Sequence, residues 1–369
     1  MLSQFFAPTD DAFTAFLTSA GFAKVEDVPV DVLKSVLLYH VLGAKVPSSA
    51  VTTGYAYTLS PVDNNKFLSL FIEKSSGVKI NNYAMVTTAD VQADNGVVHI
   101  IDKVISPLSV GELVAVNPQL SSLANAVVSE NLLNTLKEKT GTFTIFAPNN
   151  AAFAKYATLP SNVTALLLYH VLGSKVYSSD VATGYAETLS KFGDYPISVK
   201  IDAGQEVKLN SSAKVIAVDI TGSNGVIHII DDVIFQPSVV AIAQQNPNFS
   251  ILVQAVIKAE LVETLSGAGP FTVFAPTNDA FNALFTSLGV SGINALTKAD
   301  LTPILLYHVV GSNVRSASLS TGKVTTLNGD IDVNVGSSVT INASVKVVAT
   351  DIQGSNGIVH VLDKVLLPK

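Results

Sequence analysis

The feature that most constrains this chain is a short motif that recurs at the scale of a whole domain. It consists of Asn-Gly, two apolar residues, His, two apolar residues and Asp, and it occurs at residues 95–102, 224–231 and 356–363. The copies lie roughly 130 residues apart, which is the length of a domain and far longer than one turn of a solenoid. The sequence therefore predicts one domain present in three copies.

Each motif is expected to be a hairpin turn followed by a buried strand. Asn-Gly before an apolar run favours a tight turn in which both residues have positive φ. Side chains alternate along a strand, yet both faces of this one are apolar, which is typical of a strand buried on both sides. We therefore expect structural roles for the turn glycines and asparagines and for the strand histidines, namely Asn95, Gly96, His99, Asn224, Gly225, His228, Asn356, Gly357 and His360.

Composition limits the class of protein and the kind of partner. Only 14% of the 369 residues are charged, against about 25% in typical soluble domains. The net charge is −7 and Arg315 is the single arginine, which disfavours nucleic acid as a partner. The absence of cysteine excludes disulfides, thiolate zinc sites and cysteine nucleophiles. No apolar run is long enough to predict a transmembrane segment, and the first residues do not resemble a signal peptide.

Two further motifs precede the Asn-Gly motif in each copy. The first, around Phe-Ala-Pro, lies at 5–13, 145–153 and 273–281 and predicts a short strand followed by a capped helix. In the third copy this helix should begin after Thr277 and end at Gly289. The second contains a Tyr-His pair and ends at Gly43, Gly173 and Gly311. A proline near its start and a glycine at its end predict a short helix that the glycine closes.

The domain boundaries are placed near Leu108 and Ser238, which gives domains at 1–108, 109–238 and 239–369. In the second and third copies, two helical patterns precede the Phe-Ala-Pro motif. The first copy has only eight residues up to and including its motif's proline, so these opening helices are absent from it. Either the chain is a fragment of a longer one, or another polypeptide supplies the missing apolar face.

These motifs, in the same order three times, resemble tandem fasciclin domains. The resemblance implies an α+β fold in which each domain is a wedge-shaped β-sandwich flanked by several helices, with the first domain lacking its N-terminal helices. It also implies a secreted or cell-surface protein that mediates adhesion or matrix contacts, with no enzyme activity and no cofactor. Because the chain has no cysteine, it looks more like a microbial than an animal member.

The resemblance further implies which residues contact partners. Animal members have been linked to integrins through the Tyr-His region and through an Asp-Ile pair that precedes the Asn-Gly turn. The first copy has Asp90-Val91 in place of Asp-Ile, so that site transfers only to the second and third copies. A structural interpretation stands beside the functional one, because a buried histidine bonded to backbone and an acid that ends a strand give the same pattern. The matching residues here are Tyr39, His40, Tyr169, His170, Tyr307, His308, Asp219, Ile220, Asp351 and Ile352.

No arrangement of residues predicts catalysis or metal binding. On a strand, positions i and i+3 face opposite ways, so His99 and Asp102 cannot chelate one ion. The sequence contains no Gly-x-Ser-x-Gly elbow and no phosphate-binding glycine loop. We expect no catalytic, metal or cofactor site.

The function that the sequence favours is a non-enzymatic adhesion or matrix scaffold that acts through multivalent contacts with a cell-surface or matrix protein. The alternatives are a filament that self-associates head to tail and a carrier of an apolar ligand. An extracellular or cell-surface location is expected, with the periplasm as the alternative. A lipid or other membrane anchor upstream of this chain is compatible with that location.

Overall fold

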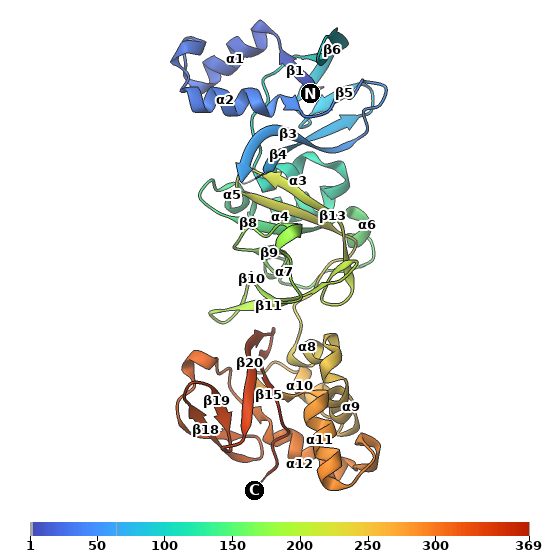
Figure 1. Cartoon of the computed structure of the whole chain (residues 1–369), viewed down its shortest axis with the longest axis vertical. Helices are drawn as coiled ribbons and strands as arrows, with labels where there is room; N and C mark the ends of the chain where they lie inside the picture. The colour runs from blue at the N-terminus through green and yellow to red at the C-terminus, as the bar shows by residue number, and fades with distance from the viewer. Residues whose placement is uncertain (1–2, 64, 369) are drawn as a thin grey trace. The chain divides into compact units, whose positions relative to one another are not determined.

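The computed structural model of the chain describes residues 3–63 and 65–368 (Figure 1). It confirms the predicted α+β class, with helices and seven strands in each copy among the described residues. The chain forms two compact units, one of Met1–Val181 with Ala213–Val233 and the other of Ala182–Ser212 with Ile234–Lys369. The second copy thus contributes to both units, and the boundaries at Leu108 and Ser238 stay a prediction.

The first copy lies entirely in unit 1. Its strands are β1 (Ser3–Pro8), β2 (Val41–Leu42), β3 (Gly54–Asp63), β4 (Lys66–Lys74), β5 (Val78–Ile80), β6 (Ala84–Ala93) and β7 (Gly96–Ile101). Its helices are α1 (Asp10–Ala20), the 3₁₀ turn η1 (Val25–Asp27) and α2 (Val30–Tyr39). The strands follow chain order around a closed barrel, which the parallel pairing of β1 with β7 completes. Figure 1 shows α1 and α2 together on one side of these strands.

The second copy is divided between the units. Unit 1 holds α3 (Val110–Val116), η2 (Pro118–Leu120), α4 (Ser121–Ser129), α5 (Leu133–Lys137), β8 (Phe143–Pro148), α6 (Asn150–Phe153), α7 (Val163–Tyr169), β9 (Val171–Leu172), η3 (Ser178–Asp180), β13 (Ala213–Gly222) and β14 (Gly225–Ile230). Unit 2 holds β10 (Gly184–Phe192), β11 (Tyr195–Ala203) and β12 (Val207–Leu209). In unit 1, β14 pairs in parallel with β8, as β7 does with β1.

The third copy lies entirely in unit 2. Its helices are α8 (Val239–Gln245), η4 (Pro247–Phe249), α9 (Ser250–Lys258), α10 (Val262–Ser266), α11 (Asn278–Leu288), η5 (Ile293–Ala295), α12 (Lys298–Tyr307) and η6 (Ser316–Ser318). Its strands are β15 (Phe271–Pro276), β16 (Val309–Val310), β17 (Gly322–Thr326), β18 (Gly329–Val335), β19 (Val339–Ile341), β20 (Val345–Gln353) and β21 (Gly357–Leu362). They form one sheet in the order β16-β15-β21-β20-β19-β18-β17, with α8 to α12 gathered on one side (Figure 1).

Helix α11 begins and ends where its sequence predicts. The Thr277 side chain accepts a hydrogen bond from the Ala280 backbone N–H, which satisfies a donor that the first turn leaves free. Gly289 closes the helix with φ of 68°, a conformation that glycine adopts without steric strain. The predicted extent of this helix is confirmed.

The helices of the Tyr-His motif end earlier than predicted. We expected the glycine to close each one, but α2, α7 and α12 end at the tyrosine. The two residues after the histidine then form a short strand. The histidine stops the helix because its ring nitrogen Nδ1 bonds the carbonyl of the residue four positions earlier, as His40 does to Val36 at 2.7 Å. The glycine instead follows the short strand.

The first copy exposes an apolar face whose counterpart in the third copy is covered by the third copy's own opening helices. In unit 2, helices α8 and α9 bury Phe281, Leu301 and Leu305 in one core cluster, and Leu305 is 3% exposed. At the corresponding position of the first copy, Leu37 is 37% exposed. The described part of the first copy has no helix before β1, and the apolar side of α1 and α2 is more open to solvent than that of α11 and α12.

Candidate functional site

The Tyr-His pairs lie inside their domains. All three histidines and all three tyrosines are at most 2% exposed. In the first copy, the N–H at Nδ1 of His40 donates to the Val36 carbonyl, and Nε2 accepts from the Ile105 N–H at 3.0 Å. His308 makes the same pair of bonds, to the Ile304 carbonyl and from the Leu366 N–H. These partners require the neutral ring, and burial lowers the pKa of His40, His170 and His308.

The tyrosine hydroxyls tie the helix to the sheet. Tyr39 donates to the Ser69 carbonyl at 2.8 Å and accepts from the Asn81 side chain at 3.1 Å. In the third copy, Tyr307 donates to the Asp330 carbonyl and accepts from Asn342. Burial raises the pKa of the Tyr39 hydroxyl. A partner can therefore reach the Tyr-His pairs only if the domain opens, and direct contact through them stays a prediction.

Each strand histidine belongs to a group of three hydrogen-bonded residues, which we call the Ser-Asp-His cluster. In the second copy it consists of Ser178, Asp219 and His228. The Asp219 carboxylate accepts from the N–H and the hydroxyl of Ser178, both at 2.8 Å. Nδ1 of His228 accepts from the backbone N–H of Asp219, which has a positive φ of 61°. The corresponding clusters are Ser48-Asp90-His99 and Ser316-Asp351-His360.

The Ser-Asp-His cluster is not arranged for nucleophilic catalysis. A serine nucleophile is activated when histidine accepts its proton and a carboxylate orients the histidine. Here the serine hydroxyl donates to the carboxylate, and the histidine bonds the aspartate backbone. Nε2 of His228 donates to the Val176 carbonyl at 2.9 Å, so both ring nitrogens are used. The cluster instead fixes a non-glycine residue in a conformation that such residues rarely adopt.

In unit 1 the Asp-Ile pair of the second copy meets the hairpin β3–β4 of the first. Asp219 forms an ion pair with Lys66 at 3.1 Å, and the Thr221 N–H donates to the Ser69 hydroxyl at 2.9 Å. Burial disfavours the Asp219 charge, but the hydrogen bonds from Ser178 and Lys66 outweigh it and lower its pKa. Ile220 is buried. We call this contact the first joint.

In unit 2 the equivalent contact joins the hairpin β10–β11 to the third copy and forms the second joint. The Gln353 N–H donates to the Ser198 hydroxyl at 3.1 Å, as Thr221 does to Ser69. Arg315 bonds Glu187 at 3.0 Å and lies 3.8 Å from Asp351. Asp219, and the residue that follows each Asp-Ile pair, therefore already serve contacts within the chain, and binding of a separate partner through the pairs stays a prediction.

The first copy has the Ser-Asp-His cluster but no such contact among the described residues. Hydrogen bonds from the side chain and the N–H of Ser48 lower the pKa of Asp90. Val91, at the position of Ile220, is 42% exposed. The cluster thus forms without a neighbouring hairpin, which shows that it belongs to the domain and not to the joint.

The Asn-Gly turn differs from the turn that its sequence predicts. The sequence predicts Asn95 and Gly96 as the two turn residues. In the structure they are Asp94 and Asn95, because Ala93 pairs with Gly96 at the end of the hairpin. None of the three asparagines has positive φ, so the expectation of positive φ at both Asn and Gly is wrong. The asparagine is used for its side chain and the glycine for its lack of one.

The asparagine side chain clamps the opening helices to the strand. The Oδ1 of Asn356 accepts from the Val239 N–H, and its Nδ2 donates to the carbonyls of Leu265 and Gly267. Asn224 makes the equivalent three bonds to α3 and to the end of α5. Asn95 has no opening helices to bond and is exposed. The amide's two donors and one acceptor thus match the free groups at the two helix ends.

Replacing Asn356 by alanine should destabilise the third copy by about 2 kcal/mol or more, because three buried backbone groups would lose their partners. The Asn95→Ala substitution is the matched control, and its effect should stay within about 0.5 kcal/mol. Hydrogen exchange of peptides from α8 and α10, compared between the two variants, measures the difference. Equal protection of α8 in both would contradict the clamp.

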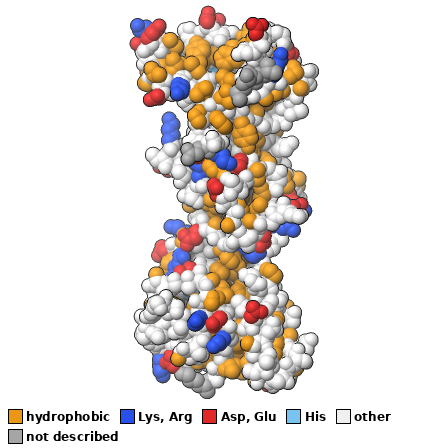
Figure 2. Space-filling view, in the orientation of Figure 1, with side chains coloured by type: hydrophobic (Ala, Val, Ile, Leu, Met, Phe, Trp, Pro, Cys, Tyr) orange, Lys and Arg blue, Asp and Glu red, His pale blue; other side chains and the backbone are white. Residues whose placement is uncertain are grey.

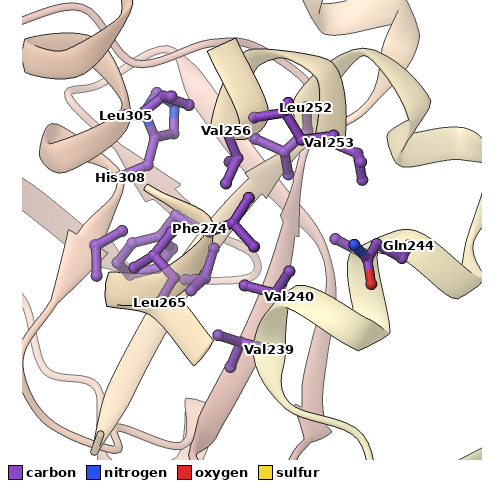
Figure 3. Close-up of a pocket in the computed structure, with 15 residues that line it drawn as sticks. Val239, Val240, Gln244, Leu252, Val253, Val256, Leu265, Phe274, Leu305 and His308 are labelled. Carbon is purple, nitrogen blue, oxygen red and sulfur yellow. The ribbon is translucent and has the colours of Figure 1, made fainter. Parts of the chain in front are cut away.

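The third copy also contains an apolar cavity, between α8, α9, α10 and the strands β15 and β16. Its volume is 40 Å³, enough for a water molecule but well below the engineered 150 Å³ cavity that binds benzene. Figure 3 shows Leu305 and His308 on one side and Gln244 on the opposite side, with valines and leucines between them. His308 uses both ring nitrogens for backbone bonds. The cavity therefore offers packing contacts but little polar recognition.

Several site residues were not predicted from the sequence. The serines Ser48, Ser178 and Ser316 follow the three Tyr-His pairs at one constant spacing, so a comparison of the copies could have found them. Lys66 and Arg315 give no such signal, because neither is repeated.

Among residues 3–63 and 65–368, no group of three or more His, Asp or Glu side chains is placed to hold a metal ion. No helix in the described part of the chain has the length and apolar character needed to cross a bilayer.

Comparisons with known proteins find the same family throughout the chain. The Fasciclin domain model matches residues 5–107, 118–237 and 247–368. Protein sll1483 of Synechocystis sp. is 44% identical over 134 residues, which are 36% of this chain and 73% of that protein. The transforming growth factor-beta-induced protein ig-h3 of Sus scrofa is 28% identical over 371 residues, which cover 98% of this chain and 52% of ig-h3.

Human periostin is 27% identical over 98% of this chain and 43% of its own length. The chain therefore spans about half the length of these two animal relatives. Among solved structures, a FAS1 domain pair from the insect cell adhesion molecule Fasciclin I has a TM-score of 0.42 and 18% identity. That match covers 68% of this chain and 97% of the other.

Proposed function

Because this chain belongs to the fasciclin family, we propose that it is a non-enzymatic adhesion or matrix scaffold that holds its partner through several weak contacts at once. Fasciclin domains are found in cell-adhesion and matrix proteins such as periostin and ig-h3. An extracellular or cell-surface location follows from the same proposal, because adhesion and matrix contacts are made outside the cell. The partner would be a cell-surface or matrix protein.

The observation that carries this proposal is that the side chains capable of catalysis are already occupied by hydrogen bonds within the protein. The histidines of all three copies, and the serine and aspartate of each cluster, are bound by groups of their own domain. What each domain offers to other molecules is therefore its surface. This favours recognition over chemistry, in keeping with the family.

The exposed surface repeats between copies. On the helices α4 and α9, Val128 and Ile257 occupy equivalent positions and are each 55% exposed. On strands β13 and β20, Ile216 and Val348 are also equivalent, at 54% and 56%. Figure 2 shows hydrophobic side chains exposed at many places on this face, with charged groups scattered among them. Equivalent apolar contacts presented twice on one chain gain affinity through effective concentration.

The test compares retention of the labelled chain on the surface of the cells that produce it. The variants are Val128→Gln, Ile257→Gln and the double substitution, which keep a good helix-forming residue at both positions. Each single variant should lose on the order of 10²-fold in retention, because one remaining contact cannot give bivalent attachment, and the double variant should lose more. Leu327→Gln, at an exposed position on the β17–β18 turn, is the control. Equal retention of the original and double-variant chains would refute multivalent adhesion through these positions.

The alternatives have less support in the structure. A filament built by repeating the joint would need a third-copy hairpin like β3–β4. The hairpin β17–β18 is shorter, because its last pair is Thr326 with Gly329 and no counterpart of Lys66 follows. A carrier of an apolar ligand would need more space than the 40 Å³ cavity provides. Adhesion is therefore the function that we propose.

A further inference from the structure

The first joint contains a cleft that the joint's own contacts do not fill. It lies in unit 1 between the hairpin β3–β4 of the first copy and η2, β13 and β14 of the second, and its volume is 310 Å³. This is within the range of small-molecule binding sites, which begins at about 300 Å³. The hydrogen bond from Thr221 to Ser69 fixes one side of the cleft. The position of this cleft wall is therefore fixed by the hydrogen bond between the two domains.

The lining combines an exposed aromatic ring with neutral polar groups. Tyr57 lines the cleft and is 53% exposed. Asn117 and Gln119 line it from the opposite domain, and Gln119 is exposed. Tyr55 is held in place by its hydroxyl, which donates to the Leu113 carbonyl, and by edge-to-face packing on Phe71 with ring centroids 5.1 Å apart. Among the described residues that line the cleft, none is charged.

We propose that this cleft binds a neutral saccharide. One face of a sugar ring presents C–H groups, which pack on the apolar face of an aromatic side chain such as Tyr57. The ring edge presents hydroxyls, each a donor and an acceptor at once. The carboxamide of Gln119 offers both a donor and an acceptor to match them. The absence of charge from the described lining sets the ligand class as neutral, since an acidic sugar would be desolvated there without a partner.

Other ligand classes fit the cleft less well. A purely apolar ligand would leave the amide of Gln119 and the hydroxyl of Tyr57 without partners. A proline-rich peptide docks between several exposed aromatic ridges, whereas Tyr55 and Phe71 pack against each other and Phe71 is buried. One exposed aromatic side chain, with amide side chains opposite it, suits a single sugar ring stacked on Tyr57.

The second joint supplies an internal comparison. The strand register places Glu187 at the position of Tyr57, since each pairs with the joint serine, and Lys200 at the position of Phe71. Glu187 bonds Arg315, and Lys200 forms an ion pair with Asp202. The two joints thus share a hydrogen bond from a backbone N–H to a serine hydroxyl but differ in lining, so saccharide binding is a property of the first joint alone.

The experiment titrates the full chain with cellohexaose, chitohexaose and maltohexaose and follows binding by saturation-transfer NMR and calorimetry. At least one probe should bind saturably with one site per chain. The Tyr57→Thr variant should weaken binding at least tenfold, and threonine is tolerated because Thr325 occupies this position in the third copy. Tyr83→Thr, which removes an exposed tyrosine outside the cleft, should bind as the original chain does.

Three outcomes would overturn the proposal: no binding of any probe, equal binding by Tyr57→Thr and the original chain, or displacement of the sugar by a proline-rich peptide at similar concentration. Circular dichroism and hydrogen exchange of β13 establish that the joint remains intact in the variant. The result is independent of the adhesion test, because Val128 and Ile257 do not line this cleft and the probes are soluble.

Discussion

Lowering the pH from 7.5 to 5 should destabilise the second and third copies by about 2 kcal/mol each. Burial lowers the pKa of His170 and His308 from 6.5 to about 4. In the unfolded chain these rings take up protons near pH 6.5, whereas in the folded chain they stay neutral. Stability therefore falls as pH falls below about 6.5, and this loss is complete near pH 4, where the folded rings are protonated as well.

The hydrogen bonds explain why a folded domain resists protonation. A proton at Nε2 of His308 would face the N–H of Leu366, which now donates to that nitrogen at 2.9 Å. Burial also lowers the pKa of His40, His228 and His360, so these rings add to the effect with the same sign. Aspartates with lowered pKa, such as Asp219, contribute at more acidic pH, because their stabilisation is lost only as pH falls through their folded pKa.

Urea unfolding at pH 7.5, 6.5, 5.5 and 5, followed by circular dichroism, measures this dependence. Hydrogen exchange of peptides from each copy assigns it to a domain. In the His308→Gln variant the third copy should lose much of its pH dependence over this range, while the second copy keeps its own. A urea midpoint that does not move between pH 7.5 and 5 would show that the histidines are not held neutral.

Replacing Gly225 by alanine should destabilise the second copy by about 3 kcal/mol. Gly225 lies opposite Phe143 in the parallel pair β14–β8, and a Cβ there would be 2.3 Å from the Phe143 carbonyl oxygen. Because that oxygen belongs to the backbone of a central strand, the clash can be relieved only by moving the strand. Gly96 and Gly357 have the same close approach, to Ser3 and Phe271.

Gly184→Ala is the matched control, because no heavy atom lies within 4 Å of a Cβ built there. It should change stability by no more than about 0.5 kcal/mol. Thermal unfolding of both variants, with hydrogen exchange of β8 and β14, separates the two cases. Equal melting temperatures for the two variants would mean that the strands separate at little cost, contrary to the close approach of their backbones.

The repeated motifs predicted the domain number, the fold class and individual helix ends because these depend on local signals. Thr277 and Gly289 bracket α11 by rules that involve only neighbouring residues. Binary patterning identified the central strands for the same reason. Where three copies agree in sequence, the sequence is sufficient to recognise the domain.

The predictions that failed depended on partners distant in sequence. The Asn-Gly rule assigned Asn356 a positive φ, but its amide is used by α8 and α10, and a local rule cannot include helices about 90 to 120 residues away. The Tyr-His helix was extended to its glycine because the bond from His40 to Val36 depends on burial of the ring. Lys66 was missed because a contact with the next domain leaves no trace in the pattern of either one.

The asparagine clamp also determines how this chain will age. An asparagine followed by glycine loses ammonia spontaneously when the glycine nitrogen attacks its side-chain carbonyl. In Asn224 and Asn356 that carbonyl is buried and bonded to a helix N–H, whereas in Asn95 it is exposed. Of these three asparagines, Asn95 should therefore deamidate first, and it lies in the copy where no described helix depends on the amide, so the added negative charge should leave the helix contacts intact.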